Sequence, residues 1–86
     1  MPRVSEFYGI VIAMYHREHP PPHFHAIYGE YEAVIGIDGM NVLEGRLPRR
    51  ARNLVVEWAA LHQGELMENW QRVQRREAPT RIMPLN

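Results

Sequence analysis

Four of the five histidines in this chain lie within residues 16–28, which read H-R-E-H-P-P-P-H-F-H-A-I-Y. Imidazole carries protons near neutral pH and is a common metal ligand, so this cluster predicts either acid–base chemistry or metal binding. The prolines at 20–22 exclude a helix and act as a stiff spacer before the next segment. Residues 23–28 then alternate as a strand does, which places His23 and His25 on one face.

A metal site is one function that these histidines predict. His23 and His25 project the same way, about 7 Å apart along a strand, and can share one ion if their side chains converge. A catalytic site needs about three protein ligands, so His19 is the expected third ligand, with His16 or Glu18 as substitutes. The cofactor prediction is therefore none, or a divalent metal held by His19, His23 and His25.

Metal-free RNA cleavage is a second function that the same residues predict. It requires a base for the 2′-hydroxyl, an acid for the leaving oxygen and cations for the phosphate. His23 and His25 are the catalytic candidates for the two proton transfers. The expected phosphate-binding residues are Arg17, Arg46 and Arg49.

A structural role is the third interpretation. Imidazoles on a strand can bond neighbouring carbonyl groups or opposing Glu and Asp side chains, and such a latch would hold the strand register. Phe24, on the other face, would then fill the core. The residues alone leave open whether the protein is an enzyme.

Composition narrows the class of protein. The chain has 86 residues, 45% of them hydrophobic, which predicts one folded domain with a modest core. It has no cysteine, so disulfides and thiolate metal sites are excluded. No apolar run approaches the roughly 18 residues of a membrane span and no signal peptide opens the chain, so we expect a cytoplasmic protein.

The net charge of zero conceals an asymmetry between the two halves of the chain. Residues 1–47 carry three Arg and six Asp or Glu, whereas residues 48–86 carry seven Arg and four Glu. The helical half therefore has a basic surface that suits RNA or an acidic partner, or is simply solvated. Its helical arginines are Arg49, Arg50, Arg52, Arg72, Arg75 and Arg76.

The apolar pattern changes from a strand period to a helical period at Pro48. Before it, strands are expected at residues 10–16, 23–28, 31–38 and 41–47, with a possible start at residues 7–9 and turns at 29–30 and 38–39. After it, helices are expected at residues 48–62 and 64–76. They are divided near Gly64, because in one straight helix Trp58 and Trp70 would lie on different faces. The fold class is α+β: an antiparallel four- to five-stranded β-meander followed by two α-helices packed on one face.

The expected domain organisation is a single domain over residues 1–86. It divides into a β-sheet half at residues 1–47, a helical half at 48–76 and a C-terminal tail at 77–86, in which Ile82 and Leu85 pack back on the body. The exposed edge strands of so small a sheet favour a homodimer.

Several segments in this order resemble a small prokaryotic family, the domain of unknown function 4160. They are F-Y-G-I-V-I-A-M-Y, H-P-P-P-H-F-H-A-I-Y-G, L-E-G-R-L-P-R-R-A, V-E-W-A-A-L-H and E-L-M-E-N-W. The most specific segment is P-P-H-F-H, which ends at His25. The resemblance covers nearly the whole chain, although Pro20 and Gly64 depart from the residues expected at their positions.

The resemblance implies a partner protein but no particular reaction. Family members are often encoded beside a second small protein, of the domain of unknown function 2442, in an arrangement that resembles a toxin–antitoxin module. The implied partner is this cognate small protein, and the implied target of a toxin is RNA; no membrane is involved. Three functions thus remain open: a nuclease-type toxin that uses His23 and His25, a non-catalytic interaction protein, and a metal-binding protein.

Overall fold

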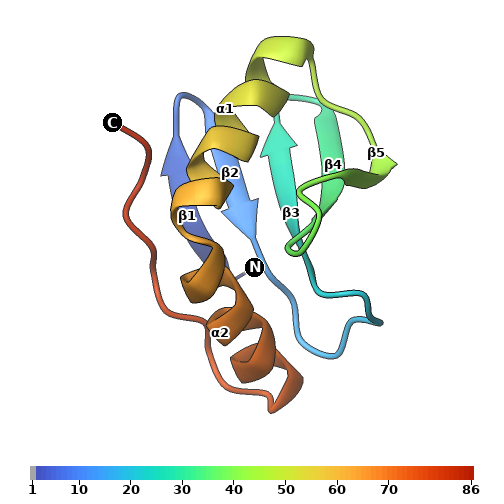
Figure 1. The fold of residues 1–86 in the computed structure, drawn as a ribbon, viewed down its shortest axis with the longest axis vertical. Coiled ribbons are helices and arrows are strands. Elements are labelled where there is room, and N and C mark those ends of the chain that lie inside the picture. The colour runs from blue at the N-terminus through green and yellow to red at the C-terminus, as the bar shows by residue number, and fades with distance from the viewer. Residues whose placement is uncertain (1) are drawn as a thin grey trace.

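A five-stranded antiparallel sheet forms one layer of the computed structural model, which describes residues 2–86 (Figure 1). Each strand pairs with the next one along the chain, so the sheet is a meander, as expected. The strands are β1 (Arg3–Phe7), β2 (Ile10–Ala13), β3 (His23–Tyr28), β4 (Tyr31–Gly36) and β5 (Val42–Gly45).

The first strand begins at Arg3, earlier than the start at residues 7–9 that the sequence predicts; Met1 lies outside the described residues. β1 is a full edge strand whose Val4 and Phe7 are buried. A shift in register between Arg3 and Ser5 breaks the period of two in this strand. That irregularity hides the apolar alternation from a reading of the sequence.

The two helices lie together on one face of the sheet (Figure 1). They are α1 (Arg49–Leu61) and α2 (Gln63–Gln74). The break lies at His62 and not at Gly64, because His62 has a φ of −126° and leaves the helical conformation. Its ring Nδ1 bonds Glu65 Oε1 at 2.6 Å in the first turn of α2. The break turns the chain so that Trp58 and Trp70 both pack inward, whereas Leu61 at the end of α1 is 69% exposed.

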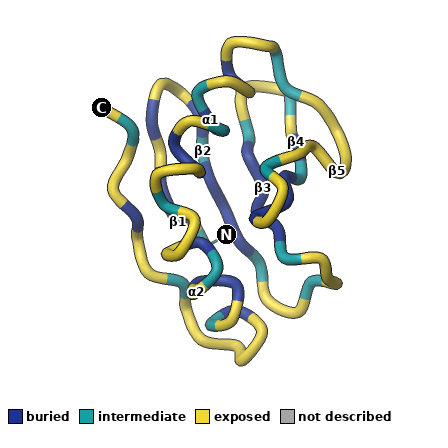
Figure 2. The backbone as a smooth tube through the Cα atoms, in the orientation of Figure 1, coloured by how far each residue is buried: buried dark blue, intermediate teal, exposed yellow. Residues whose placement is uncertain are grey.

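The hydrophobic core fills the space between the sheet and the helices, and the buried segments converge there (Figure 2). Phe24 of β3 faces this core, with its ring 6.0 Å from that of Trp58. Alternation along β3 therefore turns His23 and His25 to the opposite face of the sheet. Trp70 of α2 nevertheless reaches His23, with 5.0 Å between the ring centroids, so the end of α2 lies beside the histidines.

The C-terminal tail packs back on the body, as the sequence predicts for Ile82. The Ile82 amide donates to the Val4 carbonyl at 2.9 Å, so the tail runs beside the β1 edge (Figure 1). The Trp58 indole donates to the Met83 carbonyl at 2.8 Å. No helix in residues 2–86 has the length and hydropathy needed to cross a membrane.

Candidate functional site

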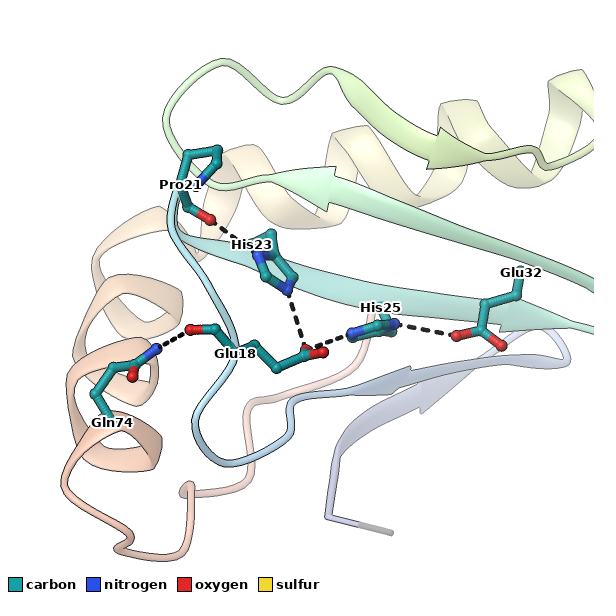
Figure 3. A network of polar contacts seen from close by, with 6 residues as sticks. All are labelled: Glu18, Pro21, His23, His25, Glu32 and Gln74. Atoms are coloured by element: carbon teal, nitrogen blue, oxygen red, sulfur yellow. Dashed lines mark hydrogen bonds and ion pairs between the residues drawn. The ribbon is translucent and has the colours of Figure 1, made fainter.

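His23 and His25 converge on one carboxylate, that of Glu18 (Figure 3). The Nε2 atom of His25 lies 2.6 Å from Glu18 Oε1, and the Nε2 atom of His23 lies 3.0 Å from the same oxygen. The two ring centroids are 5.5 Å apart, and each histidine is 8% exposed. β3 supplies the two histidines, and the loop between β2 and β3 supplies the carboxylate.

Two long-range contacts hold this loop over the sheet. The Gln74 side chain, at the end of α2, donates to the Glu18 carbonyl at 2.9 Å, and the Ile37 amide donates to the Pro22 carbonyl at 3.0 Å. Arg17 adopts a left-handed φ of 61°, and the bond between Pro20 and Pro21 is cis. The Glu18 side chain remains 30% exposed. The loop that carries Glu18 is therefore positioned by contacts from α2 and from the residue that follows β4, both far away in sequence.

The other nitrogen of each ring also has an oxygen partner. His23 Nδ1 lies 2.8 Å from the Pro21 carbonyl oxygen, and His25 Nδ1 lies 3.0 Å from Glu32 Oε2. A carbonyl or an ionised carboxylate can only accept, so both Nδ1 atoms carry hydrogen and donate. In the neutral imidazole this leaves the lone pair on Nε2, and both Nε2 atoms face Glu18.

Glu18 is ionised in this setting. Burial is the largest single influence on the Glu18 carboxyl and raises its pKa, but hydrogen bonds from His25 and His23, together with their charge, outweigh burial. The pKa of Glu18 is therefore lowered from its ordinary value, and its oxygens only accept at neutral pH. Glu18 Oε1 is therefore the common partner of both Nε2 atoms.

Aromatic rings pack against both histidines and restrict their orientation. The Tyr15 ring lies edge-on to His25 at 4.6 Å between centroids, and the Trp70 ring lies 5.0 Å from His23. Desolvation by burial, with the charges of Glu32 and Glu18, raises the pKa of Tyr15, so its hydroxyl stays protonated. The imidazole planes are fixed by packing as well as by hydrogen bonds.

The cluster opens into a pocket of about 390 Å³. Besides the three clustered residues, the pocket contains one further carboxylate, a third imidazole and four apolar side chains. These are Glu44, His19, Pro20, Pro21, Val34 and Leu43. Negatively charged and neutral groups therefore surround the open side of the cluster.

Comparison with known families identifies the chain. The sequence profile of the family described as "Domain of unknown function (DUF4160)" matches residues 9–71. The chain belongs to this family. The matched segment contains Glu18, His23, His25 and Glu32, so the whole histidine–carboxylate cluster lies within the DUF4160 region. No curated protein and no solved structure matches the chain.

The structure brings together only part of the site expected from the sequence. In this DUF4160 chain the group able to hold an ion consists of Glu18, His23 and His25, whose ligand atoms all lie within 4.8 Å of one another. His19, the expected third ligand, is exposed and lines the pocket without joining the group. His16 is exposed in the loop and is not part of a buried strand.

The arginines expected to bind phosphate do not form part of the histidine pocket. None of Arg17, Arg46 and Arg49 lines the pocket, and all three are exposed. The Arg46 guanidinium lies instead over the Tyr31 ring, 5.3 Å from its centroid. The acid–base pair and the expected phosphate clamp therefore do not form one site.

Glu32 is the functional residue that the sequence analysis missed. The turn at residues 29–30 sets the β3–β4 register, which pairs Ile27 with Glu32 and His25 with Val34. Glu32 is therefore a near neighbour of His25 on the same face of the sheet. The two-residue turn was visible in the sequence, and counting outward from it would have found Glu32.

Proposed function

We propose that this protein binds one divalent transition-metal ion through Glu18 Oε1, His23 Nε2 and His25 Nε2. The observation that carries the proposal is the arrangement of hydrogen bonds around both rings. Each Nδ1 is committed to an oxygen acceptor, Pro21 for His23 and Glu32 for His25, while each Nε2 faces the same carboxylate oxygen. Metal-binding histidines typically donate their second nitrogen in this way.

The spacing of the three ligand atoms suits an ion after a small adjustment. Two ligands that each lie about 2.1 Å from an ion, at a tetrahedral angle, are about 3.4 Å apart. The present separations from Glu18 Oε1 are 2.6 and 3.0 Å, so the carboxylate needs to withdraw by less than about 1 Å, and all three ligand atoms already lie within 4.8 Å of one another. Glu18 lies in a loop and is partly exposed, which permits such a movement.

The ligand types favour zinc, iron, cobalt or nickel over magnesium or calcium, because imidazole nitrogen suits the former ions and oxygen-rich sites suit the latter. Three protein ligands leave coordination positions that face the pocket beside Glu44. The proposed site is therefore able to accept a further ligand.

The metal proposal receives more support than RNA cleavage by His23 and His25. A base and an acid should be free to act separately, whereas both Nε2 atoms here bond one oxygen of Glu18. The pocket contains Glu18 and Glu44 and no arginine, which disfavours a phosphate. The two-gene toxin–antitoxin arrangement, the cognate small protein, the homodimer and the cytoplasmic location stay predictions.

The decisive experiment is zinc titration of untagged, chelator-treated protein by isothermal calorimetry, with cobalt absorption spectra as a second readout of the ligands. We expect one ion per chain. Replacing a ligand, in Glu18→Gln or His25→Asn, should weaken zinc binding by more than about 100-fold. His19→Asn is the matched control, because His19 lies on the same loop, and should leave the affinity unchanged.

Folding of each variant is checked by circular dichroism, since these residues also hold the loop in the ion-free protein. The structural-latch interpretation predicts that the ligand variants lower the melting temperature and that zinc binds none of the proteins. Absence of stoichiometric binding to the wild type, or an equal loss in His19→Asn, would overturn the metal proposal.

A further inference from the structure

The first turn of α1 carries a concentration of positive charge with no acidic residue beside it in that turn. Arg49, Arg50 and Arg52 all lie here. All three are exposed, and within residues 2–86 none of them forms an ion pair. The amino-terminal end of a helix is already positive, so cations there are unfavourable unless an anion approaches.

A groove with an apolar floor lies beside these arginines, between α1 and β5. It has a volume of about 620 Å³, and its apolar side chains are Met40, Val42 and Val56. Arg52 forms part of its rim. Val42 is 37% exposed although it lies in a strand, so the floor is open to solvent.

Two further hollows continue this surface along α1. One, of about 460 Å³, shares Asn53 and Glu57 with the groove and adds Arg49, Arg50 and Leu54. The other, of about 230 Å³, shares Arg50 and Leu54 and is lined by Tyr8 and Tyr28. Tyr8 is 56% exposed and Tyr28 is 38% exposed. Tyrosine, arginine and methionine are residue types enriched at protein interfaces.

We infer that this surface docks an acidic, partly apolar peptide segment of a partner protein. The carboxylates of the segment pair with Arg49, Arg50 and Arg52, and its apolar side chains cover Met40, Val42 and Val56. Charge complementarity selects an acidic partner, because the three arginines have no partner in the described chain. The aliphatic floor of the groove favours an apolar peptide side chain over a base, since Met40, Val42 and Val56 provide no ring for stacking; the tyrosines lie in the neighbouring hollow.

The inference is independent of the proposed metal site. The groove shares no lining residue with the pocket beside Glu18. It also lies on a different element, α1, whose arginines attract an anion. The histidine cluster, in contrast, lies beside the carboxylate of Glu44. Failure of one proposal therefore leaves the other standing.

A random peptide library displayed on phage tests the inference, with the whole protein as the immobilised target. We expect enrichment of peptides that combine Asp or Glu with large apolar residues. Synthetic versions of the enriched peptides should bind Arg49→Gln/Arg52→Gln at least about tenfold more weakly than wild type. Arg76→Gln/Arg81→Gln removes the same charge from exposed positions outside the groove and should bind them as the wild type does.

Val42→Ser tests the floor of the groove without changing charge and should also weaken binding. A fluorescent single-stranded RNA of mixed sequence is measured in parallel against the same variants. The inference is overturned if no peptide is enriched, or if both double variants weaken binding equally. It is also overturned if RNA binds and only Arg49→Gln/Arg52→Gln weakens it, because the surface would then be a nucleic-acid site.

Discussion

Replacement of Glu32 by Gln tests how the proposed ion site is organised. Glu32 accepts a hydrogen bond from His25 Nδ1 at 3.0 Å and does not itself belong to the ligand group. Glutamine retains an oxygen acceptor of the same reach but loses the negative charge that makes the ring a better ligand. We therefore expect weaker metal binding from a protein whose ion-free fold is nearly unchanged.

The expected loss of zinc affinity follows from the exposure of Glu32. The expected loss of stability follows because zinc binds only the folded protein. Loss of such an outer partner typically reduces metal affinity by about 10- to 100-fold. Because Glu32 is 52% exposed and the hydrogen bond is retained, we expect the lower value, about tenfold. Zinc at about 100 times the wild-type Kd stabilises the wild type by about 2.7 kcal/mol. The same zinc concentration stabilises Glu32→Gln, with its tenfold weaker affinity, by about 1.4 kcal/mol.

Thermal unfolding followed by circular dichroism measures this difference. For a chain of this size, zinc should raise the wild-type Tm by about 11–22 °C and the Glu32→Gln Tm by about 6–11 °C at the same free zinc concentration. Glu30→Gln is the control, because Glu30 is exposed in the same hairpin and its replacement removes the same charge. A zinc response of Glu32→Gln equal to that of Glu30→Gln would refute the orienting role of Glu32.

Three other predictions concern stability in the absence of metal. The pKa of Glu18 is lowered in the folded state, so its carboxylate should stabilise the wild type relative to Glu18→Gln above pH 4.5. This difference in unfolding free energy should vanish as the pH falls below that value. Urea unfolding of both proteins across this pH range measures it. Asn69 is fully buried and makes three hydrogen bonds with Thr80, so Asn69→Ala should reduce the unfolding free energy by about 1–3 kcal/mol. Arg50→Glu should increase it by about 0.6–2 kcal/mol, because it replaces an unfavourable charge in the first turn of α1 with a favourable one.

Each of these measurements has a matched comparison. A Glu18→Gln effect that persists unchanged at pH 3 would contradict the ion-pair explanation. Asn53→Ala, at an exposed position in α1, should cost far less than Asn69→Ala, and equal costs would contradict the role of the Thr80 contacts. Arg76→Glu, just beyond the end of α2, should not stabilise; if it matched Arg50→Glu, general charge balance and not the helix end would be responsible.

Local patterns predicted much of the fold because the interactions that form it are local in sequence. The helical period after Pro48 predicted two helices, and the turn at residues 29–30 predicted the β3–β4 hairpin. The predictions were wrong where a local irregularity hid the pattern. A register shift concealed β1, and the helix break moved to His62 because that residue, and not Gly64, leaves the helical conformation.

The sequence by itself determined that His23 and His25 share a face, because the period of two is a property of any extended strand. Only the tertiary structure decided which groups meet them there. Glu18 replaces His19 because Gln74, 56 residues further along the chain, holds the Glu18 carbonyl and with it the loop. None of the three expected arginines lines the histidine pocket, although Arg17 belongs to the same loop as Glu18. The spacing of side chains within one strand depends only on local backbone geometry. The contact between a loop and a distant helix forms only when the whole chain packs.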